Sequence, residues 1–156
     1  MTELEILIEA YVSGAVLLQD SLQNLDSSSV DLRPIPNKWA IREVVCHLTD
    51  SEIIYADRFK RVLAEDNPTF FEADPVKFCT SLCVGSRRIE DELDVIASVR
   101  KHMASILKSI DESSFNRLGQ HSLDGPMTLR VLVQRITNHI SHHIRFIDEK
   151  RERMSC

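Results

Sequence analysis

Four stretches of this chain repeat apolar residues every three or four positions, and that period constrains the fold more than any other feature. The stretches run over residues 2–25, about 40–64, about 86–110 and 128–153. Apolar residues at this spacing form one stripe along an α-helix, and the stripe must be buried against other helices. Four such helices of comparable length predict an all-α fold, a single-domain four-helix bundle that spans residues 1–156.

The ends of these stretches carry helix-boundary signals. The first opens with Thr2 and Glu5 in the spacing of a capping box, and Thr128 is a suitable N-cap for the last. The chain has only four glycines and five prolines, which suits helices. No segment alternates apolar and polar residues with period two, so we expect no β-sheet.

The connections between the expected helices are unequal. About 15 residues separate the first two helices, and about 20 separate the second from the third, by the ranges above. A connection as long as the second often has a function. It could also cross the end of the bundle, so that the helices it joins would run parallel.

Charge and composition exclude some functions. The net charge is −5, whereas non-specific nucleic-acid binding needs a clustered basic surface. No apolar run approaches the roughly 20 residues of a membrane span, and Glu3 and Glu5 stand where a signal peptide would carry basic residues. We therefore expect a cytoplasmic protein with no nucleic-acid partner and no membrane association.

The cysteines show no C-x-x-C pair. They are Cys46, Cys79, Cys83 and Cys156. Cys79 and Cys83 have a spacing that could bind metal on a helix, but ordinary reduced cysteines are the favoured interpretation. Cys46 adjoins His47, and neighbouring residues on a helix point about 100° apart, so Cys46 should face away from any metal at His47.

The histidines provide the first sign of chemistry. His139 and His143 are four residues apart and fall within about 40° of each other on the apolar face of the last helix. His142 points about 100° away from His143, toward the polar side. Two imidazoles on an apolar face could bind one metal ion together with His47 from the second helix, or could be core histidines with hydrogen-bond partners.

The chain resembles a known family in three segments. Residues 38–52 read KWAIREVVCHLTDSE, residues 121–129 read HSLDGPMTL, and His139 and His143 form an H-x-x-x-H helix. In order and separation these segments resemble the DinB/YfiT-like superfamily of metalloenzymes. The doubled His142-His143 is most similar to the YfiT-like branch.

The resemblance implies a four-helix bundle of up-down-down-up type, commonly a homodimer, with one divalent metal ion, zinc or nickel. The family's three histidine ligands correspond to His47, His139 and His143. Two positions depart from the family pattern. Ala40 replaces a Ser or Thr that would cap the second helix, and Phe146 occupies a position that is commonly polar.

Three other residues are candidates for the site. Asp50 lies three residues after His47, and it could orient a ligand, act as general base, or form an ion pair. Trp39 could wall a substrate pocket or simply pack. His121 could close over the site from its loop, or be a surface histidine.

Three functions remain open from the sequence. Three neutral imidazoles leave a divalent metal its charge and one open position, so the metal could activate water for hydrolysis of a small-molecule substrate. It could instead activate a low-molecular-weight thiol for S-transfer, a chemistry that the resemblance also includes. The third possibility is a helical module without catalysis, whose metal is structural or absent.

Overall fold

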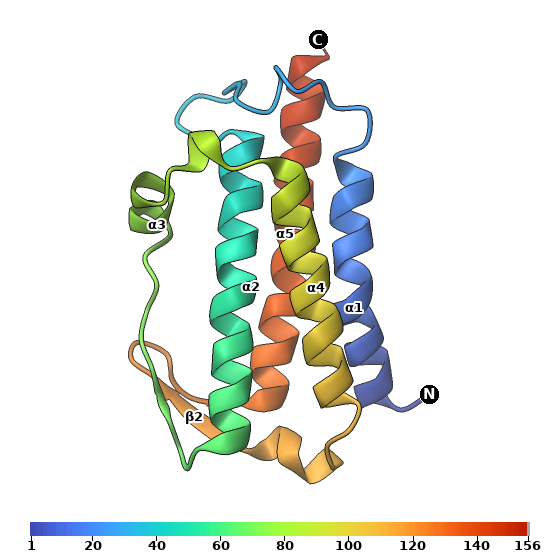
Figure 1. Cartoon of the computed structure of the whole chain (residues 1–156), viewed down its shortest axis with the longest axis vertical. Helices are drawn as coiled ribbons and strands as arrows, with labels where there is room; N and C mark the ends of the chain where they lie inside the picture. Colours follow the sequence, from blue (N-terminus) through green and yellow to red (C-terminus); the bar gives the residue numbers. More distant parts are fainter. Residues whose placement is uncertain (156) are drawn as a thin grey trace.

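The computed structural model of the protein describes residues 1–155 and confirms the four-helix bundle. Its long helices are α1 (Glu3–Ser21), α2 (Ile41–Ala64), α4 (Ile89–Leu107) and α5 (Leu129–Met154). Figure 1 shows α1 and α5 running up and α2 and α4 running down, which is the up-down-down-up order. Each of the pairs α1–α5, α2–α4, α2–α5 and α1–α4 is in contact, so the four helices form a closed ring.

Two consecutive helices run parallel because the chain between them returns along the whole bundle (Figure 1). This connection comprises residues 65–88 and contains the strand β1 (Thr69–Phe70), the short helix α3 (Pro75–Ser81) and the 3₁₀ turn η1 (Val84–Ser86). We call residues 65–88 the strap. It lies beside α2, and its elements α3 and η1 contact that helix.

The predicted helix boundaries hold at three of the four starts. Thr2 and Glu5 form the capping box, and the Thr128 side chain accepts from Val131 N. At Ala40 only half of a box exists, since the Glu43 carboxylate accepts from Ala40 N at 2.7 Å and alanine has no side-chain acceptor. The third expected helix begins later, at Ile89, because η1 precedes it.

The first helix ends earlier than its apolar pattern suggested, at Ser21 and not near residue 25. Asn24 adopts φ 58°, a left-handed conformation that ends a helix and that asparagine tolerates better than most residues. Leu22 and Leu25 nevertheless pack against the buried core cluster around Leu18. The apolar residues continue beyond the end of the helix because the loop that follows also packs on the core.

The expectation that the chain has no sheet is wrong. The described residues form a three-stranded sheet in the order β1-β2-β3, where β2 is Leu118–His121 and β3 is Gly125–Thr128. β1 runs parallel to β2, with Phe70 opposite His121, and β2 is antiparallel to β3. Strands of two to four residues are too short for alternation to be recognised in the sequence. The sheet lies at the lower end of the bundle in Figure 1.

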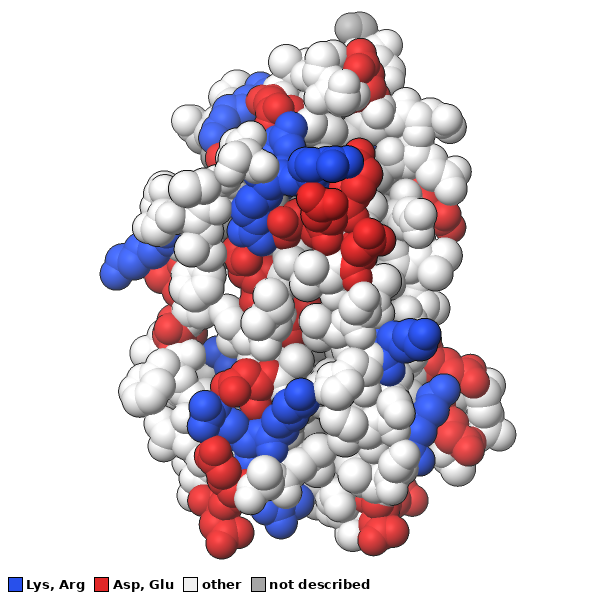
Figure 2. All heavy atoms as spheres, viewed as in Figure 1, with Lys and Arg blue, Asp and Glu red and all other residues white. Residues whose placement is uncertain are grey.

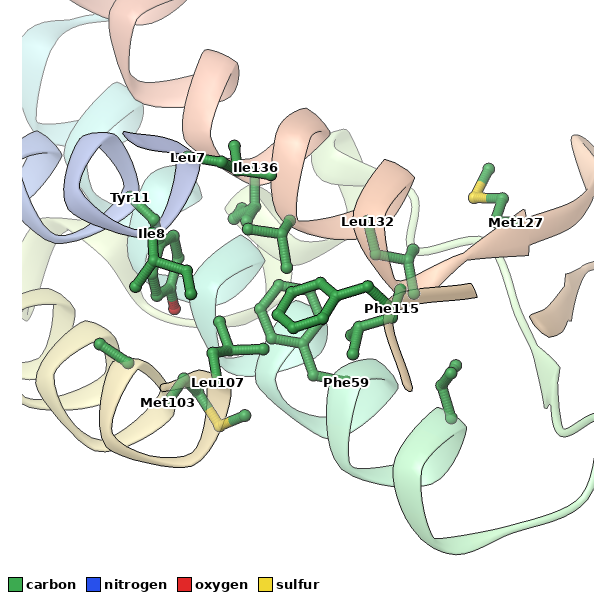
Figure 3. Packing of buried hydrophobic residues seen from close by; sticks show 14 of the residues in the cluster. Leu7, Ile8, Tyr11, Phe59, Met103, Leu107, Phe115, Met127, Leu132 and Ile136 are labelled. Carbon is green, nitrogen blue, oxygen red and sulfur yellow. The ribbon is translucent and has the colours of Figure 1, made fainter. Parts of the chain in front are cut away.

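The core continues through the bundle as two buried clusters. The cluster nearer the sheet joins all four helices to the turn before β2, and Figure 3 shows Phe59, Phe115 and Leu132 among its side chains. The other cluster lies toward the opposite end and includes Leu18, Ile41 and Ile140. The stripes predicted from the sequence supply most of both clusters.

A pair of oppositely charged residues, Arg100 and Glu52, lies inside this core. Arg100 of α4 is 1% exposed and donates to Glu52 Oε1 of α2 at 2.6 Å. The same guanidinium donates to the backbone oxygen of Tyr11 in α1 and, at 2.9 Å, to that of Ile136 in α5. Arg100 therefore links all four helices, and the sequence analysis did not anticipate it.

The outer surface shows no concentration of one charge on the face in Figure 2, where acidic and basic side chains are interspersed. Many of them form pairs, such as Arg42 with Asp31 at 2.7 Å. None of the helices within residues 1–155 carries an apolar stretch long enough to cross a membrane.

The close approach of α1 to Arg100 generates a stability prediction. A side-chain carbon at Gly14 would clash with Nη1 of Arg100, which its hydrogen bonds hold in place. Replacing a helical glycine by alanine normally stabilises a protein by up to about 1 kcal/mol. We expect Gly14→Ala to lower the free energy of unfolding by about 2 kcal/mol, as overpacking does.

Urea unfolding followed by circular dichroism measures this change. Gly85→Ala is the control, since nothing lies within 4 Å of an added carbon there. A stabilised Gly14→Ala variant would contradict the tight contact between α1 and Arg100.

Candidate metal centre

The structure brings together the three histidines that the sequence predicted as ligands. His47 projects from α2, and His139 and His143 project one turn apart from the neighbouring antiparallel α5. Nε2 of His139 lies 3.0 Å from Nε2 of His47 and 3.1 Å from Nε2 of His143. Within the described part of the chain, a ligand atom from each residue lies within 4.8 Å of the other two.

These distances suit a shared cation. Nitrogen ligands about 2.0–2.1 Å from zinc lie about 3.3–3.4 Å apart at the tetrahedral angle, and about 2.9 Å apart at right angles. Two imidazole nitrogens that face each other need a proton or a cation between them, because their lone pairs repel. The cluster can thus be satisfied by hydrogen bonds among the imidazoles or by one metal ion at their centre.

Burial keeps the imidazoles neutral. Desolvation, followed by the nearby His143 and His47, lowers the pKa of His139 to about 3. Desolvation and the charges of His47 and His142 lower the pKa of His143 to about 4. Burial also lowers the pKa of His47, which Asp50 partly counteracts. Neutral rings at pH 7 are what metal ligation requires.

Aromatic rings surround the cluster. The Trp39 ring meets that of His47 edge-on, with centroids 5.3 Å apart, so Trp39 packs directly against the candidate site. Phe146 packs against the rings of His142 and His143. Nδ1 of His143 is buried without a hydrogen-bond partner among residues 1–155, so no protein group orients this ring through Nδ1.

His142 points away from the cluster, as the helical phase predicted. It is exposed, and its Nδ1 lies 3.2 Å from Nη2 of Arg145. His142 is not in the group of three convergent histidines.

Asp50 is engaged in an ion pair. Its carboxylate accepts from Nη2 of Arg87 at 2.9 Å and from Nη1 at 3.2 Å, and Arg87 also pairs with Glu92. The ion-pair alternative considered from the sequence is therefore present. A role as general base stays a prediction, and it would require the carboxylate to leave Arg87.

His121 is not a surface histidine. It is 6% exposed at the end of β2, where its Nδ1 accepts from Leu123 N and Asp124 N, both at 3.2 Å. The neutral ring therefore carries its proton on Nε2, which lies 3.4 Å from a Glu72 carboxylate oxygen. The short β2–β3 hairpin buries it, and the sequence analysis had treated this hairpin as a loop.

A cavity of about 510 Å³ adjoins the cluster. Its walls are the 51–58 stretch of α2, the 135–142 stretch of α5, the strap at residues 72–73 and the β2–β3 hairpin. His139 belongs to both the three-histidine cluster and the cavity wall, and His121 lines the cavity as well. The volume is within the range of small-molecule sites.

The cysteines lie outside the cluster. Cys46 is buried, which raises its pKa to about 12, and it is not one of the convergent ligands. Cys79 lies in α3, whereas Cys83 follows that helix in a left-handed conformation with φ 49°. The helical spacing considered for a Cys79–Cys83 pair therefore does not exist. Cys156 lies outside the described residues.

Comparisons with known proteins give the site a context. The model of the DinB superfamily matches residues 13–147. A protein of Bacillus mycoides is 25% identical over 138 residues, which are 88% of this chain and 79% of that protein. A protein of Oceanobacillus iheyensis is 24% identical over 131 residues, 84% of this chain and 76% of its own length. Both carry the name "Putative metal-dependent hydrolase".

A solved structure shares the fold. YfiT from Bacillus subtilis superposes with a TM-score of 0.92 at 22% sequence identity, covering 99% of this chain and 90% of that one. It is described as "a probable metal-dependent hydrolase with an unusual four-helix bundle topology". At this identity the likeness shows the fold alone.

The low pKa values of the cluster predict how stability depends on pH without metal. In the unfolded chain these histidines have the ordinary pKa of 6.5 and bind protons below that pH. In the folded protein the pKa values of His139 and His143 are about 3 and about 4, so both rings stay neutral until the pH is much lower. The free energy of unfolding is therefore highest above pH 6.5, as far as these two groups determine it, and it falls as the pH drops below 6.5. Two protons withheld over about two pH units would amount to about 5 kcal/mol at about pH 4.5, and solvent screening of the partly exposed rings reduces the loss that we expect to about 3 kcal/mol.

Urea unfolding of the metal-free protein between about pH 7.5 and about pH 4.5 measures the loss. The comparison is a His139→Gln, His143→Gln double variant, which should lose much less over the same interval. Equal losses in the two proteins would mean that burial does not hold these imidazoles neutral.

Proposed function

The chain belongs to the DinB superfamily, and we propose that it is a metal-dependent hydrolase whose single divalent ion is bound by His47, His139 and His143. The convergence of three neutral imidazoles from two helices, beside a cavity of small-molecule size, carries this proposal. The names of the relatives from Bacillus mycoides and Oceanobacillus iheyensis support it. They favour a metal ion at the centre of the cluster over hydrogen bonds alone.

A zinc or nickel ion on three imidazoles would supply a nucleophilic water at neutral pH and a Lewis acid for a carbonyl. The protein's own groups would hold and orient the substrate. His139 borders the cavity, so a substrate bound there lies next to the ligands. His121 presents Nε2–H in the same cavity and can donate a hydrogen bond to a substrate oxygen. Trp39 restricts the His47 ring.

The ligand assignment makes a direct prediction for metal affinity. Replacing His47, His139 or His143 by alanine leaves two imidazoles to bind the ion. Loss of a group that only hydrogen-bonds a metal ligand costs about 10–100-fold in affinity, and we expect loss of a ligand to lower the affinity for zinc by more than that. His142→Ala should bind zinc like the wild type, because His142 is exposed and outside the cluster. Competition with a chromogenic chelator measures all four variants.

Two results would contradict this assignment. Zinc loss in His142→Ala with retention in His143→Ala would show that the wrong face of α5 binds the metal. Equal binding by all four variants would show that the cluster holds no metal, which would leave hydrogen-bonded core histidines.

The choice of nucleophile is tested separately. The zinc-loaded protein is incubated with activated esters and amides, and in parallel with glutathione or bacillithiol plus an electrophile. We expect metal-dependent hydrolysis that His139→Ala abolishes. Metal-dependent formation of the thiol conjugate without hydrolysis would contradict a hydrolase and indicate a thiol S-transferase.

A further inference from the structure

Arg58 is a buried cation without an acidic partner. Its residue exposure is 7%, and no carboxylate within residues 1–155 lies within 4.0 Å of its guanidinium, the limit for a salt bridge. Arginine is rarely buried unless it is paired, because desolvating its charge is costly. Arg100, the other arginine buried inside the bundle, has Glu52 at 2.6 Å. Arg58 therefore has room for a countercharge that residues 1–155 do not supply at bonding distance.

The guanidinium of Arg58 is held in a fixed position. It lies over the Tyr55 ring, 4.9 Å from the centroid, and 5.9 Å from the centroid of Phe70 in β1. One nitrogen, Nη2, donates to the backbone oxygen of Phe71 at 2.9 Å. This is a single bond out of the five donors that arginine offers. The Arg58 side chain lines the 510 Å³ cavity, so its remaining N–H donors are available to a molecule bound there.

The other charges of the cavity wall are either paired with an opposite charge or open to water. Asp124 accepts from Nη1 of Arg135 at 2.7 Å, and the opposite charges of these two residues neutralise each other. Glu72 lies 3.4 Å from Nε2 of His121 and is half exposed. Arg58 is thus the charged group of this wall that is largely buried and has no countercharge at bonding distance within residues 1–155.

Arg58 and the metal centre lie on the same side of α2. Arg58 follows His47 by eleven residues, which places the two about 20° apart around the helix and about 16 Å apart along it. Ser51, Ile54 and Tyr55 line the cavity between them. The antiparallel α5 supplies the facing wall, with His139 toward one end and Arg135 toward the other. The cavity is therefore a trough with the histidine cluster near one end and Arg58 at the other.

We propose that Arg58 binds an oxyanion of the substrate, a carboxylate or a phosphate, at the end of the trough remote from the three histidines. The substrate is then an elongated small molecule whose anionic group is separated from its reacting group by most of the trough. The part about the reacting group rests on the proposed hydrolase function. The anion site itself needs no metal.

The test exploits that independence by using metal-free protein. We would titrate hexanoate, hexyl phosphate and the uncharged hexanol into protein labelled with nitrogen-15, and follow the Nε–H signal of Arg58. Hexanoate, hexyl phosphate or both should shift this signal saturably, with at least tenfold weaker binding of hexanol. The stronger of the two anions identifies the oxyanion class.

Variants then assign the site. Arg58→Gln should weaken the preferred anion at least tenfold, and Arg58→Lys, which keeps a charge, should weaken it less. Arg61→Gln is the matched control, since Arg61 lies on the same helix but pairs with Asp57 and Glu65 outside the cavity. Circular dichroism melting checks that each variant folds.

The outcomes separate this proposal from the metal proposal. Failure of both anions to saturate the wild-type signal, equal binding of hexanol, or full binding by folded Arg58→Gln would each overturn the anion site. None of these results involves metal. Normal anion binding by a protein that fails to bind zinc would refute the hydrolase proposal and leave the anion site standing.

Discussion

The buried bond between Arg100 and Glu52 is the interaction on which the rest of the structure depends. Both side chains are about 1% exposed, and the arginine also holds backbone oxygens of α1 and α5. Desolvation raises the pKa of Glu52, and the charge and hydrogen bond of Arg100 oppose that rise. Removing one partner of such a pair typically costs 3–5 kcal/mol, because a charge is left buried and uncompensated.

The Arg100–Glu52 pair acts as a clamp between the helices, and it also sets the register of the candidate metal centre. Glu52 follows His47 by five residues on α2, and Ile136, whose oxygen Arg100 binds, precedes His139 by three residues on α5. Arg100 thus binds α2 and α5 about one turn away from His47 and His139, and these bonds limit how far the two helices can slide past each other. Residues 92 positions apart in the chain thereby bring their Nε2 atoms to 3.0 Å. The bundle and the site thus share one constraint.

The helices and the pairing of His139 with His143 could be predicted because both depend on a local period, whereas His47 as the third ligand followed from the family resemblance. Spacing alone places His139 and His143 on one face and His142 off it. Arg100 could not be found in this way, since a charge within an apolar stripe shows its partner only in three dimensions. His121 and Arg58 depend on the β2–β3 hairpin and the strap, whose strands are too short to leave a pattern. The segments with the weakest local signal form much of the cavity.

The parallel course of α2 and α4 connects the topology to the chemistry. It requires the strap, and the strap supplies Glu72 and Ala73 to the cavity wall and the Phe71 oxygen to Arg58. β1 of the strap also pairs with β2 of the hairpin that buries His121. A bundle with three short turns would present the same histidines on an open groove between two helices. The long connection thus gives the candidate metal centre an enclosed side.

The central claim is that three imidazoles hold one divalent ion and leave a position open. X-ray absorption at the zinc edge of the zinc-loaded protein tests it most directly, because it reports the number and type of ligand atoms. We predict three imidazole nitrogens at about 2.0–2.1 Å and at least one exchangeable oxygen, and no sulfur. A closed shell of four protein ligands, or a zinc–sulfur distance of about 2.3 Å, would contradict the account.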